Sequence, residues 1–483
     1  MYKATIGLEI HVQLSTKTKL FCGCSTEFAR EPNTQVCPVC LGLPGVLPVL
    51  NEKAIEYGVK LALAMRMEIN EFSTFYRKNY FYPDLPKGYQ ITQYGIPLAK
   101  NGSLEINTKE GLKKVRIQKG HLEEDSGKSI HLGDITESEF SFIDFNRSGV
   151  PLMEIVTEPD LESGDEVYEF LVLLRSIVRT LGVSSGDMEK GALRCDVNIS
   201  VSKDKTRGTK VEVKNLNSFR TVKRAIEYEI ERQIGLIEKG ERIIQETRHF
   251  DEKEGTTKPM RVKEELNDYR YFPEPDLPPL ILDKNYIEGI KHSLPELPNE
   301  KEKRFISQYG MPEDYARSIA YSPKMSEYFE NVAKFVNHPR EVANFLMVNI
   351  AGFLNEKDLE ITDIKFGKEH FKELFELIES SKISVNIAKS VIEDCLRENK
   401  SPMQVVQEKG ITQISDTGSL RKIVSEVLRD NSLQVEQYLN GKEKVFAFLI
   451  GQVMKKTQGK ANPETANKLL LEEISKLKNE RQR

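Results

Sequence analysis

The sequence predicts an α+β fold class: a large sheet-containing domain followed by two smaller helical domains. Three observations support this prediction. Apolar and polar residues alternate over residues 4–14 and 194–201, which is the period of a half-buried strand. Turns rich in Pro and Gly punctuate the chain up to residue 293. Beyond that point apolar residues recur at spacings of three and four, which is the period of a helix.

The length of 483 residues allows two to four domains, at about 100–200 residues per domain. We predict domains at residues 1–293, 294–402 and 403–483. Helices are expected in both later domains, over segments 297–310, 325–337, 339–355, 368–382, 401–410, 416–431, 443–457 and 464–478.

Composition excludes several classes of protein. The formal net charge of -4 is too close to neutral for non-specific coating of nucleic acid, so any RNA contact should come from local patches. No apolar run approaches the roughly 20 residues of a membrane helix, and the N-terminus lacks the pattern of a signal peptide. We therefore expect a soluble, cytoplasmic protein. Its six cysteines then favour metal binding over disulfides.

The first predicted strand, over residues 4–14, places Glu9 and His11 on its polar face, about 7 Å apart. A neighbouring carboxylate and imidazole can bind a divalent cation or transfer protons. The alternative is a solvated polar face.

Two further acidic clusters favour the cation. Residues 121–125 follow a short predicted strand at 115–120, and Glu154 follows the segment 144–152. Mg²⁺ prefers oxygen ligands, usually one or two carboxylates together with phosphates. We expect a pocket that joins Glu9, Glu124 and Glu154 and suits Mg·ATP.

A predicted hairpin pairs residues 194–201 with 209–217. Its polar face carries Arg194, Asp196, Asn198 and Lys214. Cations here could neutralise phosphate, and a carboxylate could hold a metal. The alternative is again a solvated sheet face.

The cysteines Cys22, Cys24, Cys37 and Cys40 form a CxC pair and a CxxC pair, separated by twelve residues. Four thiolates on tight turns suit tetrahedral Zn²⁺, and because they leave no open position the zinc should be structural. The alternative is four free thiols.

Two segments are candidates for RNA contact. The loop 75–94 interleaves basic and aromatic side chains, as sites for single-stranded RNA ends do; its candidates are Arg77, Lys78, Tyr80, Tyr82 and Lys87. The basic C-terminal segment adds Lys455, Lys456 and Lys460, which could contact an RNA backbone. The alternatives are aromatics that cover a core and an ordinary solvated helix.

Other catalytic motifs are missing from the sequence. It contains no GxxxxGK[ST] phosphate loop, no GxGxxG loop after a strand, no HExxH, and no evident serine or cysteine nucleophile with its base.

Taken together, the motifs resemble one family, the B subunit of the glutamyl/aspartyl-tRNA amidotransferase. The resemblance covers nearly the whole chain. It rests on residues 6–14, 75–94, 121–129, 144–155, 191–201, 212–219, 268–280 and 451–463.

The resemblance implies a first domain similar to the glutamine synthetase catalytic fold, then a helical domain and a small helical tail that binds tRNA. It implies ATP and Mg²⁺ as cofactors, with Mg²⁺ bound by Glu9, His11 and Glu124 and with Glu154 as a further candidate. In some members zinc occupies the position of the four cysteines.

The implied activity is ATP-dependent transamidation of misacylated Glu-tRNA(Gln), Asp-tRNA(Asn) or both. The side-chain carboxylate is phosphorylated and then amidated, with ammonia from an amidase A subunit; a small C subunit completes a heterotrimer. Two other hypotheses stay open: a zinc-stabilised RNA-binding protein without catalytic activity, and a free-standing ligase that uses ammonia directly.

Overall fold

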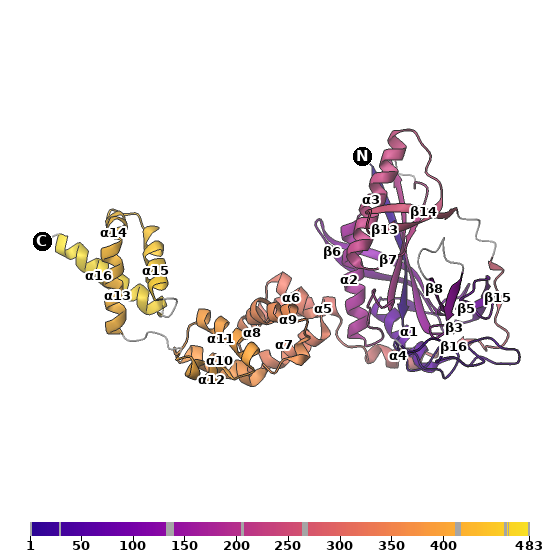
Figure 1. Ribbon diagram of the computed structural model, residues 1–483, viewed down its shortest axis with the longest axis horizontal. Helices are drawn as coiled ribbons and strands as arrows, with labels where there is room; N and C mark the ends of the chain where they lie inside the picture. Colours follow the sequence, from indigo (N-terminus) through magenta and orange to yellow (C-terminus); the bar gives the residue numbers. More distant parts are fainter. Residues whose placement is uncertain are drawn as a thin grey trace. The chain divides into compact units, whose positions relative to one another are not determined.

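The computed structural model describes residues 2–28, 30–131, 140–203, 207–262, 269–410, 417–457, 461 and 463–481. The chain forms two compact units, Met1–Lys301 and Glu302–Arg483 (Figure 1). Each unit buries its own apolar side chains, and the two boundaries predicted between the three domains stay predictions.

The first unit is built on a large mixed sheet. Its strands follow the order β14-β13-β12-β11-β1-β10-β7-β5-β4-β15, with β6 also paired to β7 and β2 to β6. Strands β12 and β13 pair in parallel and their neighbours pair antiparallel, so the sheet is mixed. The strands are β1 (Lys3–Gln13), β2 (Glu68–Ile69), β3 (Phe72–Ser73), β4 (Phe75–Asn79), β5 (Tyr89–Gln93), β6 (Ala99–Thr108), β7 (Gly111–Glu124), β8 (Lys128–His131), β9 (Ser141–Asp144), β10 (Pro151–Thr157), β11 (Leu193–Ser202), β12 (Val211–Lys214), β13 (Glu246–Asp251), β14 (Thr256–Val262), β15 (Phe272–Pro273) and β16 (Leu280–Ile281).

Strand β1 confirms the predicted alternation. Ile6, Leu8 and Ile10 are fully buried on one face, whereas Glu9 and His11 are half-buried on the other. Since apolar side chains must leave water, the first face is the one that needs a cover.

The cover comes from helices that the sequence analysis did not single out: α1 (Glu52–Ala64), α2 (Gly164–Thr180) and α3 (Phe219–Glu238), followed by α4 (Lys284–His292). Helix α1 packs at Gly58 against Leu122 of β7, and Gln233 of α3 reaches the carbonyl of Ile199 in β11. Figure 1 shows α2 and α3 alongside the sheet. The polar side chains lie on the opposite face of the sheet.

Strand β7 corrects one expectation. The acidic cluster at residues 121–125 was expected to follow a short strand, but the strand continues to Glu124. It does so because β10 pairs with it without a break from Ile155↔Gly120 to Pro151↔Glu124. Successive side chains on a strand point to opposite faces, so Glu123 and Glu124 are separated by the sheet.

The second unit is helical, as predicted. Its helices are α5 (Pro298–Tyr309), α6 (Glu313–Ala320), α7 (Pro323–Val336), α8 (Pro339–Phe345), α9 (Ala351–Lys357), α10 (Lys368–Glu379), α11 (Val385–Glu398), α12 (Pro402–Glu408), α13 (Thr417–Asp430), α14 (Ser432–Leu439), α15 (Val445–Lys456) and α16 (Pro463–Arg481). A π-helical segment, Leu346–Ile350, joins α8 to α9, and a short 3-10 helix, Ile361–Asp363, precedes α10. None of the helices within the described residues is both long and apolar enough to cross a bilayer.

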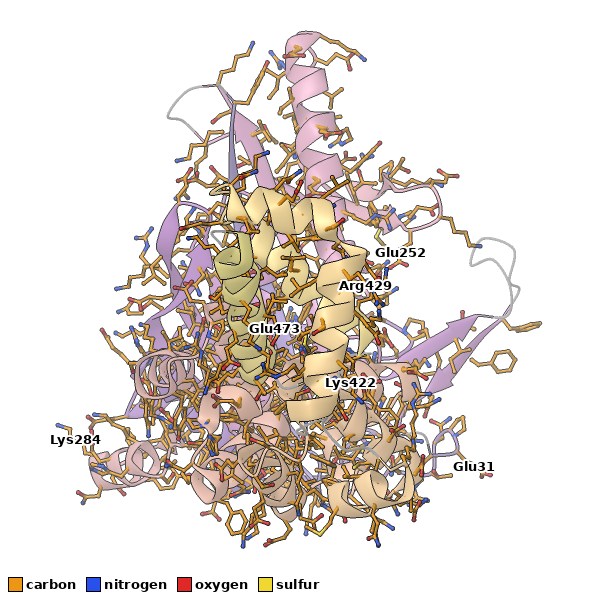
Figure 2. The ribbon with its side chains drawn as sticks, turned by 90° about the vertical axis from the view of Figure 1, so that its left-hand side faces the viewer. Glu31, Glu252, Lys284, Lys422, Arg429 and Glu473 are labelled. Carbon is orange, nitrogen blue, oxygen red and sulfur yellow. The ribbon has the colours of Figure 1, made fainter. Side chains whose placement is uncertain are left out.

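This unit contains two separate apolar cores. One gathers buried residues between Phe305 and Val405, and the other gathers buried residues between Leu420 and Ile474. In the latter, Arg421 of α13 donates to Glu472 and to Glu473 of α16, the second of which is labelled in Figure 2. The two helices are thereby held by packing and by ion pairs.

Candidate functional site

Three strands bring acidic and imidazole side chains into one row on the polar face of the sheet. His11 of β1 lies opposite Glu154 of β10, and Glu154 lies opposite His121 of β7. On the other side of β1, Arg194 of β11 lies opposite His11. Directly opposite residues on antiparallel strands share a face with Cβ atoms about 4.5–5.5 Å apart. The register therefore assembles a polar cluster.

The cluster could hold a cation. Ligand atoms of Glu9, His11 and Glu154 lie within 4.8 Å of one another, and so do those of His121, Glu123 and Glu154. The Nε2 atom of His11 is 3.3 Å from Glu123 Oε1 and 3.6 Å from Glu154 Oε2. His121 Nε2 is 3.2 Å from Glu154 Oε2. Carboxylate oxygens are the ligands that Mg²⁺ prefers.

Without a cation, protons on the imidazoles balance this charge. Burial lowers the pKa of His11, but hydrogen bonds to Glu123 and Glu154 outweigh it and raise the pKa to about 10. His121 is affected in the same way, mainly by Glu154, and its pKa rises to about 9. Burial raises the pKa of Glu123, but the two histidines hold it at about 2. A divalent cation here would take over the role of those protons.

Glu124, which the sequence analysis placed among the Mg²⁺ ligands, points to the opposite face. Its carboxylate forms an ion pair with Lys87 and accepts a hydrogen bond from the backbone N–H of Ile91 at 2.8 Å. Glu123 and His121, which sequence reasoning missed, occupy the cluster instead. The signal for them was available, because His121 and Glu123 are two residues apart and share a strand face.

The hairpin residues extend the polar face along β11 and β12. Asp196 lies opposite Glu9 and forms an ion pair with Lys214. Arg194 donates to Asp125 at 2.9 Å, and the nearby Asp125 carboxylate raises the pKa of its guanidinium. This face therefore presents two cations beside the carboxylate cluster.

Asn198, the remaining hairpin candidate, lies opposite Gly7 and lines a depression of about 240 Å³ together with Ser200 and Lys210. Its Oδ1 atom is buried without a hydrogen-bond partner in the described part of the chain. Asn198 is thus on the same face as Asp196, two residues further along the strand.

In the predicted RNA-contacting loop, some side chains form ion pairs among the described residues and others do not. Arg77 is bound to Glu274 at 2.7 Å and to Asp276 at 3.3 Å, and Lys87 is held by Glu124. Tyr82 is exposed.

Lys78 and Tyr80 are half-buried and lie close to each other. The Nζ atom of Lys78 lies 5.9 Å from the ring centre of Tyr80 and 5.0 Å from that of Tyr269. Burial lowers the pKa of Lys78, but the surrounding acidic groups, Glu123 first among them, together outweigh it and raise the pKa. Lys78 therefore stays charged.

Among the C-terminal candidates, Lys455 is exposed at the end of α15. Lys456 forms ion pairs of 3.0 Å with both Glu426 and Asp430. Lys460 lies outside the described residues.

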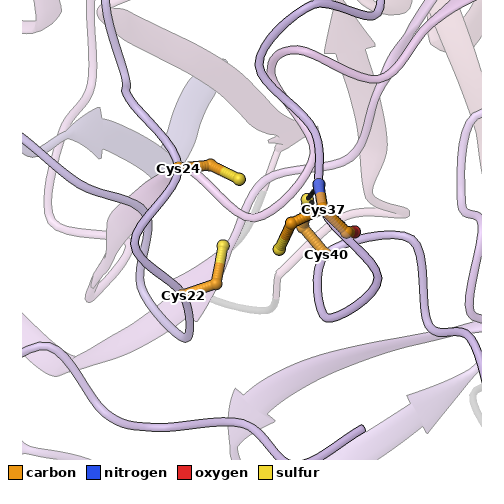
Figure 3. Close-up of side chains that lie close together, drawn as sticks. All are labelled: Cys22, Cys24, Cys37 and Cys40. Atoms are coloured by element: carbon orange, nitrogen blue, oxygen red, sulfur yellow. Dashed lines mark hydrogen bonds between the residues drawn. The ribbon is translucent and has the colours of Figure 1, made fainter.

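The four predicted zinc ligands meet in one place. The Sγ atoms of Cys22, Cys24, Cys37 and Cys40 all lie within 4.8 Å of one another (Figure 3). A tetrahedral zinc with Zn–S bonds of about 2.3 Å requires sulfur atoms about 3.8 Å apart, so the group could hold a metal. The backbone N–H of Cys37 donates to Cys40 Sγ at 3.2 Å, as the dashed line in Figure 3 marks. A hydrogen bond from Cys22 is the main reason that the pKa of Cys40 falls to about 4.

Comparison with known proteins agrees with the architecture. Residues 4–288 match the family model of the GatB/GatE catalytic domain, and residues 327–474 match that of the GatB domain. The chain is 52% identical over 473 residues to the B subunit of the aspartyl/glutamyl-tRNA(Asn/Gln) amidotransferase of Thermotoga maritima, and the match covers 97% of this chain and 98% of that protein. The protein of the same description from Caldanaerobacter subterraneus subsp. tengcongensis is 51% identical over 477 residues, covering 98% of this chain and 100% of its own length.

Proposed function

Since this chain belongs to the family of aspartyl/glutamyl-tRNA amidotransferase B subunits, we propose that its polar sheet face activates and amidates an acidic amino acid on misacylated tRNA. The enzyme is a ligase that acts in translation, and the substrates are Glu-tRNA(Gln), Asp-tRNA(Asn) or both. The observation that supports the reaction site best is the cluster of Glu9, His11, Glu123 and Glu154 on the polar face of the sheet.

The chemistry requires activation, because a carboxylate oxygen is a poor leaving group. Transfer of the ATP γ-phosphoryl group to the side-chain carboxylate breaks the β–γ phosphoanhydride bond and yields ADP and an acyl phosphate. Ammonia then attacks the acyl carbon, the C–O bond to phosphate breaks, and the products are the amide, inorganic phosphate and a proton. Phosphoryl transfer of this kind depends mainly on positioning and charge neutralisation.

The carboxylates Glu9, Glu123 and Glu154 would hold Mg²⁺, with His11 as a further ligand. Glu123 replaces Glu124 in the set predicted from sequence, because its carboxylate is on the clustered side of the sheet. When bound, Mg²⁺ supplies charge neutralisation to the transferring phosphoryl group. His121 contacts both Glu123 and Glu154, and would keep their oxygens oriented.

Cations on the same face would bind the phosphates and the acyl phosphate. Lys214 is anchored by Asp196, Arg194 is anchored by Asp125, and Lys78 stays charged beside Glu123. A fixed cation needs no reorganisation when negative charge moves, which is the reason preorganised groups lower barriers. Asn198, whose Oδ1 has no partner within the described residues, is suited to orient a bound polar group.

The four cysteines would bind one structural zinc. Tyr80 and Tyr82 remain candidates for contact with the tRNA 3′ end, and Lys455 for contact with the tRNA body. Arg77, Lys87 and Lys456 are weaker candidates, since each is held in ion pairs within the chain. Ammonia would come from an amidase A subunit, with a small C subunit completing the complex.

The test is reconstitution with candidate A and C partners, followed by assay with glutamyl-tRNA, ATP and glutamine. We expect ATP hydrolysis that depends on misacylated tRNA and yields amidated product. Tight tRNA binding without such hydrolysis would instead support an RNA-binding protein. Equal activity with free ammonia and no A subunit would support a free-standing ligase.

A further inference from the structure

A fully buried lysine lies beside the four-cysteine group. Lys19 follows strand β1 and precedes the first cysteine pair, and its side chain is completely inaccessible to solvent. Its Nζ atom is 3.6 Å from Cys40 Sγ and 3.3 Å from the carbonyl oxygen of Phe145. In the described part of the chain no carboxylate lies within ion-pair distance of it.

A buried ammonium is costly unless an opposite charge compensates it. Since no acidic side chain among the described residues pairs with Lys19, its compensating charge is the thiolate group to which Cys40 belongs. Four thiolates around one zinc carry a net charge of about -2, so the lysine and the metal site stabilise each other. The second partner of Lys19, the Phe145 carbonyl, extends this contact beyond the cysteines.

Phe145 belongs to a loop, residues 145–150, that docks on the cysteine segment. The N–H of Phe145 donates to Asn33 Oδ1 at 2.8 Å, and the N–H of Gln35 donates to Asn146 Oδ1 at 2.8 Å. The N–H of Leu20 donates to the Gly149 carbonyl at 2.8 Å. Both Asn33 and Gln35 lie between the two cysteine pairs, so the position of this loop depends on how that segment is held.

The other side of the same loop holds Asp125. The N–H of Gly149 donates to the Asp125 carbonyl at 2.9 Å, and the N–H of Asp125 donates to the Val150 carbonyl at 2.8 Å. Arg147 lies 3.5 Å from the Asp125 carboxylate, which also accepts from Arg194 at 2.9 Å. Gly149 has φ +87°, and a Cβ there would lie 3.4 Å from Lys19 Cδ, so loop and lysine are in close contact.

We propose that Lys19 is a positioning residue that couples the four-cysteine site to the Asp125–Arg194 pair of the proposed reaction site. The lysine is held by the thiolates, the loop is held by the lysine and the cysteine segment, and Asp125 is held by the loop. The zinc would therefore maintain the geometry of the reaction face as well as the local fold. The catalytic part of this inference rests on the proposed function; the structural coupling does not.

The test compares three variants of the full chain. Lys19→Met removes the charge and keeps most of the side-chain volume, Lys19→Arg keeps the charge, and Lys17→Met is the control, because Lys17 is exposed two residues away. The measurements are zinc release to a chelator, amide hydrogen exchange across residues 121–150, and kcat and KM for glutamyl-tRNA in the reconstituted complex.

We expect Lys19→Met to release zinc about tenfold faster or more and to exchange faster within 145–150 and at Asp125. Its kcat should fall about tenfold to a hundredfold while KM changes little, because the substitution would disturb the alignment of groups on the reaction face. Lys19→Arg should recover part of each loss, and Lys17→Met should match the wild type.

Wild-type zinc retention and exchange in Lys19→Met would overturn the coupling, and so would purified wild-type protein that holds no zinc. If Lys19→Met does not fold, the Lys19→Arg variant decides. Amide exchange and turnover close to those of the wild type in Lys19→Arg support the coupling. Faster amide exchange and lost turnover in Lys19→Arg, although zinc is retained, refute it. If the wild type shows no amidation at all, the proposed function fails, while zinc release and exchange still test the coupling.

Discussion

The Nε2 atom of His11 lies 3.3 Å from a carboxylate oxygen of Glu123, although their strands, β1 and β7, are separated in the sheet by β10. Both side chains lie on the same face as Glu154 of the intervening strand, and His11 is also 3.6 Å from Glu154. Three carboxylates and two imidazoles thereby share one face of the sheet, and several consequences can be measured.

Glu123→Gln removes one charge from this group with little change in shape. We expect kcat for glutamyl-tRNA-dependent ATP hydrolysis to fall about 10–100-fold, because oriented carboxylates at a metal site contribute that much. Steady-state kinetics with varied Mg²⁺ should show a raised Mg²⁺ requirement. Glu110→Gln, in the exposed turn between β6 and β7, is the matched control. Unchanged Mg²⁺ dependence in Glu123→Gln would remove Glu123 from the site.

The cluster should give the metal-free protein a distinctive pH dependence. The pKa of His11 is raised from 6.5 to about 10, so its contribution to stability is complete below pH 6.5 and is lost as the pH rises toward 10. The pKa of Glu123 is lowered from 4.5 to about 2, so its contribution is complete above pH 4.5 and is lost as the pH falls toward 2. The difference in unfolding free energy between wild type and His11→Gln, measured by denaturation in chelator, should therefore be largest between pH 4.5 and 6.5. A difference that grows above about pH 8 contradicts this assignment.

Lys214→Met should impair phosphoryl transfer. The ammonium is fixed by Asp196 opposite Glu9, and removing one such preorganised group costs about a hundredfold in kcat. Rapid-quench measurement of ADP formation reports this step directly. Lys239→Met, at the exposed end of α3, should behave as the wild type. An intact burst of ADP in Lys214→Met would place Lys214 outside the reaction.

Arg77 and Lys455 should respond differently, although the sequence suggested both as RNA contacts. Arg77→Met breaks a bidentate pair with Glu274, whose side chain is fully buried, and should cost about 3–5 kcal/mol of stability. Lys455→Ala should leave stability unchanged and reduce the salt dependence of tRNA binding by about one counterion. Filter-binding titrations across salt concentrations separate the two. A smaller salt slope in a folded Arg77→Met variant would return Arg77 to the RNA surface.

The cysteine site should bind close to one zinc per chain. Cys37→Ser removes one ligand and should abolish zinc retention through a desalting column, with a lower melting temperature, because structural zinc contributes folding free energy directly. Cys395→Ser alters a buried cysteine outside the group and serves as the control. Equal zinc content in the two variants, measured by atomic emission, would contradict the assignment.

Much of the local structure could be predicted from the chain. Apolar and polar residues alternate over residues 4–14 because one face of β1 is apolar. In the helical segments of the second unit, apolar residues recur at the helical period because each helix buries one apolar stripe. The spacing of the four cysteines, in two short pairs, also indicated a shared site. Such patterns are readable because each depends on a few neighbouring residues.

The main residue that sequence reasoning placed differently from the structure is Glu124. In the run His121-Leu-Glu-Glu, either glutamate could face the cation, and the choice depends on whether the strand ends before the run or continues through it. It continues because β10 pairs with β7 as far as Glu124. That pairing partner is distant in the chain, so no local pattern could reveal it.

The order of residues along the chain was thus enough to establish which side chains alternate, which segments are helical and which four thiols can share a metal. It took the folded arrangement to establish that β1, β10 and β7 are neighbours in a register that aligns His11, Glu154 and His121. The same holds for Lys19, which lies between the thiols and the loop that holds Asp125. The physical reason is that periodicity is a property of one segment, whereas register and burial are set by pairing and packing among segments far apart in the chain.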